Sequence, residues 1–148
     1  MLKLFYILIA SVCNGQKINY INKFDSIKIF SLNYNSNYPN LTTESDIILK
    51  GETLTIKNND DINVIYKMLL GLFFFNKEGK LLRKKSSSHD FRSVFVFYGK
   101  NQKISTMFFP RSHSNTAYLN SFSYQIKSVN IDELFQKKYP IISDLLRK

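Results

Sequence analysis

Two apolar runs joined by a short polar turn constrain the fold more than any other feature of this sequence. Phe91–Tyr98 and Lys103–Phe109 flank the turn Gly99-Lys100-Asn101-Gln102, and this pattern predicts an antiparallel β-hairpin. We expect Tyr98 to lie opposite Lys103, with one strongly apolar face packed on a helix and the other face mixed and partly exposed. The apolar face then holds Phe91, Phe95, Phe97, Ile104 and Phe108, and the mixed face holds Arg92, Val94, Val96, Tyr98, Lys103, Ser105, Met107 and Phe109.

The remaining segments predict an α+β fold. Alternating and β-branched residues indicate further strands over residues 18–34, 46–49, 53–57 and 122–126. The polar cap Asn59-Asp60-Asp61 precedes apolar residues at helical spacing, which predicts a core helix over about residues 60–75. Asn130-Ile131-Asp132-Glu133 resembles a capping box and opens a C-terminal helical segment that Tyr139-Pro140 interrupts. We therefore predict an antiparallel sheet of about four to six strands, with the core helix and the C-terminal helical segment packed on one face.

The first sixteen residues have the layout of a secretory signal. The charged start Met1-Leu2-Lys3 precedes a largely apolar run from Leu4 to Val12, which Cys13-Asn14-Gly15-Gln16 ends. Such a run is about 13 Å long as a helix and too short to cross a membrane core of ~30 Å. We predict a signal peptide over residues 1–15 and a single exported domain, periplasmic or secreted, over residues 16–148. The alternative is a lipoprotein anchored through Cys13, the chain's one cysteine.

The chain is strongly basic, with a formal net charge of +10 at pH 7, and such a surface attracts anionic partners. Few of its cations are arginine, the residue that nucleic-acid recognition favours, so the composition argues against a nucleic-acid partner. The densest basic stretch is Asn76–Lys85, which Gly79 and the serines that follow indicate to be a loop. The predicted binding residues are its cations Lys77, Lys80, Arg83, Lys84 and Lys85.

Two histidines belong to the one residue cluster in the sequence that is suited to catalysis or metal binding. His89 and His113 both lie at the open end of the predicted hairpin, where Asp90 falls opposite Arg111. Two histidines and an acid could hold a metal, or could move protons in phosphodiester cleavage with help from nearby cations. His89, Asp90, Arg111 and His113 are therefore the candidate catalytic residues. The simpler interpretation is an Asp90–Arg111 cross-strand ion pair, with the histidines on opposite faces of the pleat.

Neither a glycine-rich phosphate loop nor a nucleophile elbow accompanies this cluster in the sequence, and we expect neither a cofactor nor a metal. The leading prediction is a non-catalytic binding module of the cell envelope or secreted space, whose partner is another protein. One alternative is a hydrolase or metal-binding protein that uses the histidine cluster. Another is a basic surface protein that binds an anionic polysaccharide or a membrane surface through Lys77–Lys85.

Overall fold

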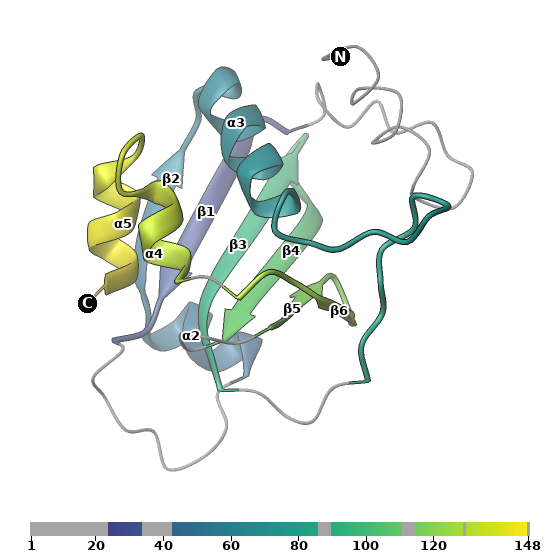
Figure 1. The fold of residues 1–148 in the computed structure, drawn as a ribbon. Coiled ribbons are helices and arrows are strands. Elements are labelled where there is room, and N and C mark those ends of the chain that lie inside the picture. The colour runs from purple at the N-terminus through teal and green to yellow at the C-terminus, as the bar shows by residue number, and fades with distance from the viewer. Residues whose placement is uncertain (1–23, 34–42, 86–89, 111–114, 129, 148) are drawn as a thin grey trace.

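A computed structural model of the chain describes residues 24–33, 43–85, 90–110, 115–128 and 130–147. In this part of the chain six strands form one antiparallel sheet in the order β2-β1-β3-β4-β5-β6 (Figure 1). The strands are β1 (Ser26–Ser31), β2 (Glu52–Ile56), β3 (Phe91–Gly99), β4 (Gln102–Pro110), β5 (Thr116–Leu119) and β6 (Phe122–Gln125), and the helices are α2 (Glu44–Lys50), α3 (Asn59–Leu70), α4 (Ile131–Phe135) and α5 (Pro140–Arg147). The predicted α+β fold is confirmed. The predicted signal peptide, with Cys13, lies outside the described residues.

The helices α3, α4 and α5 cover one face of the sheet, and α2 packs against the other (Figure 1). Because successive strand residues point to opposite sides, the central strands β1 and β3 contribute apolar side chains to both faces. The first core lies under the three helices and joins Ile27, Ile29, Phe95 and Phe97 to Ile65, Phe135 and Leu146. The second core lies on the α2 side and contains Phe30, Leu32, Val94, Val96 and Phe108 with Ile47 of α2.

The turn between β3 and β4 is the predicted one. Tyr98 lies opposite Lys103, and the two-residue loop of Lys100 and Asn101 has φ angles of 51° and 61°. Positive φ at both positions gives the loop the twist that suits a two-residue hairpin. Asp25 supports the loop, because its carboxylate accepts the Lys100 N–H at 2.6 Å and its own N–H donates to the Tyr98 carbonyl at 2.9 Å.

A bulge next to this turn reverses part of the predicted facing pattern. Phe97 lies opposite Ser105, so Ile104 is an extra residue on β4. Beyond a bulge, every side chain of the shifted strand points to the face opposite to the predicted one. Ile104 packs against the first core as predicted. On β4 the predicted faces are wrong for Ser105, Met107, Phe108 and Phe109: Ser105 lies opposite Phe97, Met107 and Phe109 pack in the first core, and Phe108 packs in the second. Phe91 of β3 also belongs with the second core, because a separate bulge at Arg92 changes its side of the sheet.

The predicted core helix is α3, which ends several residues earlier than the sequence indicates. At its start the Asn58 side chain accepts the N–H groups of Asp60 and Asp61 at 2.9 and 3.1 Å. The helix ends at Leu70, and the N–H of Phe74 instead donates to the carbonyl of Gln125 at 3.1 Å. An apolar run looks alike in a buried helix and in an extended segment, so the continuation to residue 75 could not be distinguished from sequence.

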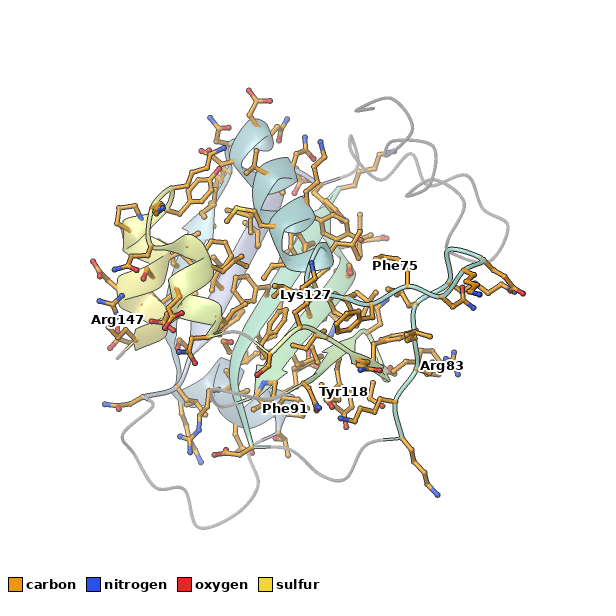
Figure 2. The ribbon with its side chains drawn as sticks, viewed as in Figure 1. Phe75, Arg83, Phe91, Tyr118, Lys127 and Arg147 are labelled. Atoms are coloured by element: carbon orange, nitrogen blue, oxygen red, sulfur yellow. The ribbon has the colours of Figure 1, made fainter. Side chains whose placement is uncertain are left out.

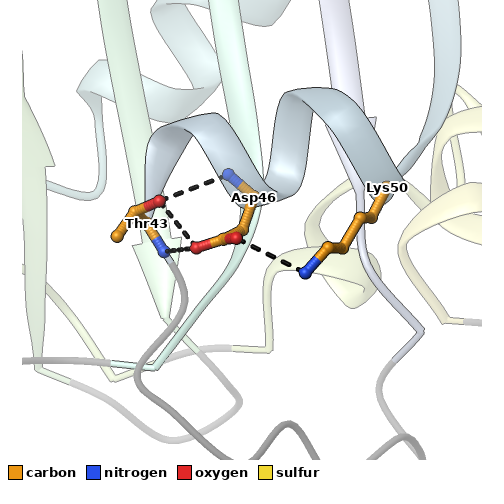
Figure 3. Close-up of polar contacts among 3 residues, drawn as sticks. All are labelled: Thr43, Asp46 and Lys50. Carbon is orange, nitrogen blue, oxygen red and sulfur yellow. Dashed lines mark hydrogen bonds and ion pairs between the residues drawn. The ribbon is translucent and has the colours of Figure 1, made fainter.

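Residues 46–49, predicted to be extended, lie in helix α2. A capping box begins this helix: the Thr43 hydroxyl accepts the Asp46 N–H at 3.2 Å, and the Asp46 carboxylate accepts the Thr43 N–H at 2.9 Å (Figure 3). The Thr43 hydroxyl also donates to this carboxylate at 2.7 Å. These hydrogen bonds lower the pKa of Asp46 because they stabilise its charged form, with Lys50 adding a smaller attraction. The prediction was wrong because the box has aspartate where the usual signature has glutamate or glutamine.

Candidate functional site

The predicted basic stretch belongs to a hairpin-like arm, residues 72–85, that is bonded to the side of β6 (Figure 1). Three antiparallel bridges define it: Phe73 with Ile126, Arg83 with Tyr124, and Phe75 with Leu81. Backbone hydrogen bonds of 2.8 to 3.2 Å join both limbs of the arm to residues 123–127. The basic stretch is therefore not a simple surface loop, because most of it is held in place by the sheet.

A tight turn forms the tip of the arm. The Asn76 side-chain oxygen accepts the N–H groups of Glu78 and Lys80 at 3.0 and 2.9 Å. Gly79 has a φ of 74°, a conformation that glycine adopts without steric cost. Lys80 and Glu78 form an exposed ion pair at 2.9 Å, and the hydrogen bond from Lys80 lowers the pKa of the Glu78 carboxyl. The turn thus places Lys77 and Lys80 at a defined position on the surface.

One face of the arm and β6 is rich in aromatic side chains. Alternate residues of an extended chain share a face, so the bridges place Phe75, Leu81, Arg83, Phe122 and Tyr124 on the same side. The Arg83 guanidinium carbon lies 4.1 Å from the centre of the Phe122 ring, which agrees with this placement. Leu81 and Tyr124 pack against the first core, whereas Phe75 and Phe122 are 37% and 49% exposed. Figure 2 shows Phe75 and Arg83 at the end of the molecule opposite to α4 and α5.

The five predicted binding cations do not have equal roles. Lys77, Lys80, Arg83 and Lys85 are exposed, whereas Lys84 is half-buried. The Lys84 ammonium donates to the side-chain oxygen of Asn115, and its backbone carbonyl accepts the hydroxyl of Ser123. Lys84 therefore anchors the arm, and the four exposed cations form its charged surface, with Glu78 as the single acid in the arm's sequence.

Of the candidate catalytic residues, Asp90 lies in the described part of the chain, and His89, Arg111 and His113 lie outside it. Phe91 lies opposite Pro110, which is the register from which we predicted Asp90 opposite Arg111. The Asp90 carboxylate accepts two hydrogen bonds from Arg92, from Nε at 3.0 Å and from Nη2 at 2.6 Å. Among the described residues, no group of three or more histidine, cysteine or acidic side chains is placed to hold a metal ion.

Arg92 is the charged residue whose burial sequence reasoning missed, because it was predicted on the mixed and partly exposed face of the hairpin. Phe91 pairs with Pro110 and Ser93 pairs with Phe109, so Arg92 is an extra residue at a second bulge. Its side chain is 2% exposed, and its Nη1 donates to the Asn33 carbonyl at 3.1 Å. The Asp90-Phe91-Arg92 spacing was the available signal, because residues two apart in an extended chain lie on the same face, where opposite charges can pair.

No protein-family model, curated protein or solved structure matches the chain. No helix in the described ranges is both long and apolar enough to cross a membrane.

Proposed function

We propose that this protein is a small exported, non-catalytic binding module of the cell envelope or secreted space, and that the arm is its contact surface for an anionic partner. One observation supports this proposal above all. The four exposed cations of the arm lie on a segment that is hydrogen-bonded to β6, beside the exposed rings of Phe75 and Phe122. Interaction sites are enriched in aromatic residues and arginine, which Phe75, Phe122 and Arg83 supply here.

The attachment of the arm favours binding over the role of a solvated connector. A flexible loop loses conformational freedom when it binds, and this loss lowers affinity. Here the limbs bond to residues 123–127, the Asn76 side chain organises the tip, and Lys84 is anchored to Asn115. The backbone that carries the exposed cations is thus held in one arrangement before any partner arrives, which reduces the cost of binding.

The alternative of a hydrolase or metal-binding protein has less support from the described residues. Asp90, the candidate acid, binds the buried guanidinium of Arg92 at 2.6 and 3.0 Å. This contact has a sufficient structural explanation, because a buried cation requires a charged or polar partner. We therefore do not propose a catalytic role for Asp90.

A heparin column tests the proposed contact surface, with heparin as the anionic probe. In the arm variant, Lys77→Gln and Lys85→Gln remove two exposed charges. In the matched control, Lys57→Gln and Lys137→Gln remove two exposed charges elsewhere. We expect the arm variant to elute at clearly lower salt than the control, because bound cations release counterions from a polyanion.

The two variants have the same net charge, so a difference between them reports the place of binding. The slope of log retention against log salt should fall by up to about two in the arm variant, close to one for each lost contact. Equal elution of arm variant and control would show that overall charge governs retention, and the arm would then not be the contact surface.

A further inference from the structure

We infer that the partner of the arm is the surface of an anionic lipid bilayer, with Phe75 and Phe122 inserted at the level of the headgroups and Arg83 bound to a lipid phosphate. This inference rests on the proposed function, because it names the partner of the same surface. It is more specific than the proposed function, because the partner must bind the cations of the arm and also take up the apolar rings of Phe75 and Phe122.

Exposed phenylalanines are concentrated at this end of the molecule. In the described ranges, the large apolar side chains with substantial exposure are Ile48, Leu49, Phe74, Phe75, Phe122 and Ile141. All three phenylalanines among them come from the arm and β6, and the three aliphatic residues come from α2 and α5. The pairing places Phe75 and Phe122 on one face and Phe74 on the other. We therefore assign Phe75 and Phe122 to the contact.

Arg83 is a cation of the arm that also contacts one of the two exposed rings, Phe122. Its guanidinium carbon lies 4.1 Å from the centre of the Phe122 ring, a cation–π contact that does not require a hydrogen-bond acceptor. The Arg83 side chain is exposed and forms no hydrogen bond with another residue in the described ranges. A phosphate oxygen fits such a guanidinium because several N–H donors can bind it at once.

Chemistry favours a bilayer over an anionic polysaccharide as the occupant. A polysaccharide satisfies cations equally well, but it offers no apolar phase to the Phe75 and Phe122 rings, which have no polar group of their own. The boundary between headgroups and acyl chains supplies anionic phosphates and apolar surface together. Lys77, Lys80 and Lys85 are exposed on the same arm and suit the negative surface potential of such a membrane.

Co-sedimentation with lipid vesicles tests this inference. We expect the purified chain to bind phosphatidylcholine vesicles that contain about one-third phosphatidylglycerol, and to bind pure phosphatidylcholine much less. Phe75→Ser with Phe122→Ser should weaken binding to the anionic vesicles about tenfold or more, because two apolar side chains no longer leave water. Phe75→Leu with Phe122→Leu should keep most of the binding, since it keeps most of the apolar area.

A matched control distinguishes insertion of Phe75 and Phe122 from nonspecific binding through other exposed apolar side chains. Leu49→Ser with Ile141→Ser removes side chains that are 81% and 63% exposed, which is more exposed apolar surface than the arm variant loses, and it should leave vesicle binding unchanged. All variants share the same N-terminus, so residues 4–12 contribute equally to each. Circular dichroism should give the same spectrum and melting curve for every variant compared.

The vesicle and heparin results distinguish the two proposals. Retention on heparin should survive Phe75→Ser with Phe122→Ser, because all cations remain. Arm-dependent retention on heparin without sedimentation on anionic vesicles would overturn the membrane inference and leave the proposed function intact, with a soluble polyanion as partner. Vesicle binding that is unchanged by the two phenylalanine substitutions would also overturn the inference. Heparin retention that does not depend on the arm would overturn the proposed function itself.

Discussion

Replacing Asp90 by alanine should destabilise this protein more than replacing Arg92 by methionine, although Arg92 is the larger and more deeply buried residue. The Arg92 side chain is 2% exposed and the Asp90 side chain is 33% exposed. Asp90→Ala leaves a buried guanidinium without its carboxylate. Arg92→Met leaves a carboxylate that water already reaches, and fills the site with an apolar side chain of similar length.

The magnitude follows from this difference in exposure. Removing one partner of a fully buried ion pair costs about 3–5 kcal/mol. Because water reaches Asp90, we expect the free energy of unfolding to fall by about 2–3 kcal/mol in Asp90→Ala. Arg92→Met also loses the hydrogen bond to the Asn33 carbonyl, but it buries no unpaired charge, so its expected cost is about 1 kcal/mol. The double variant should resemble Arg92→Met alone, because neither charge remains in it.

Urea unfolding followed by far-ultraviolet circular dichroism measures these free energies; the chain contains no tryptophan as a fluorescent probe. Asp144→Ala is the matched control, since Asp144 is an exposed carboxylate on α5, and it should change the free energy of unfolding by less than about 0.5 kcal/mol. The reasoning would be refuted if Arg92→Met cost as much as Asp90→Ala. It would also fail if the double variant were as unstable as the sum of the two single variants.

Three further substitutions test other parts of the structure. Thr43→Ala should lower the free energy of unfolding by about 1 kcal/mol through the lost cap of α2, and should move the pKa of Asp46 up toward its ordinary value. A carboxyl NMR titration with no change in that pKa would contradict this account. Burial, followed by the hydrogen bond that Tyr139 donates to Asp61 at 2.9 Å, raises the pKa of Tyr139 to about 12. The fold therefore favours the neutral phenol, and its stabilising contribution is complete below about pH 10 and lost as the pH rises toward 12. Tyr139→Phe should accordingly be less stable than the parent protein at neutral pH, and denaturation at a series of alkaline pH values should show this difference closing. The Ser93 hydroxyl is buried with no hydrogen-bond partner in the described ranges, so Ser93→Ala should raise the melting temperature, with a gain of up to about 1 kcal/mol. A marked fall in the melting temperature would disprove this reading of Ser93.

Local chemistry made part of the fold predictable from sequence. The β3–β4 turn, the polar start of α3 and the break before Pro140 all depend on residues close together in the chain. The structure contains the turn and the break, and it caps α3 with Asn58, one residue before the predicted Asn59. The two bulges were not predictable in the same way. An extra residue at Ile104 or Arg92 leaves the apolar pattern almost unchanged, and only the packing of both sheet faces selects it.

The candidate site shows the same limit. Its cations were identified from composition, but their arrangement depends on pairing between residues about forty positions apart, such as Arg83 with Tyr124. Phe74 and Phe75 were predicted as part of a helix because their local sequence is as apolar as that of a buried helix. The exposure of Phe122 likewise follows from its place on the last strand of the sheet, which no local pattern indicates.

The attachment of the arm to β6 has a consequence for the behaviour of the protein in solution. The outermost strand of a sheet presents unpaired N–H and C=O groups, which can template pairing with another copy of the chain. Here the backbone of residues 72–84 takes up such groups on β6 and on the residues that follow it. Any change that releases the arm, such as a proteolytic cut at its tip, would open an edge strand and favour strand-to-strand aggregation. The segment proposed to bind a partner therefore also covers the β6 edge, which could otherwise pair with another copy of the chain.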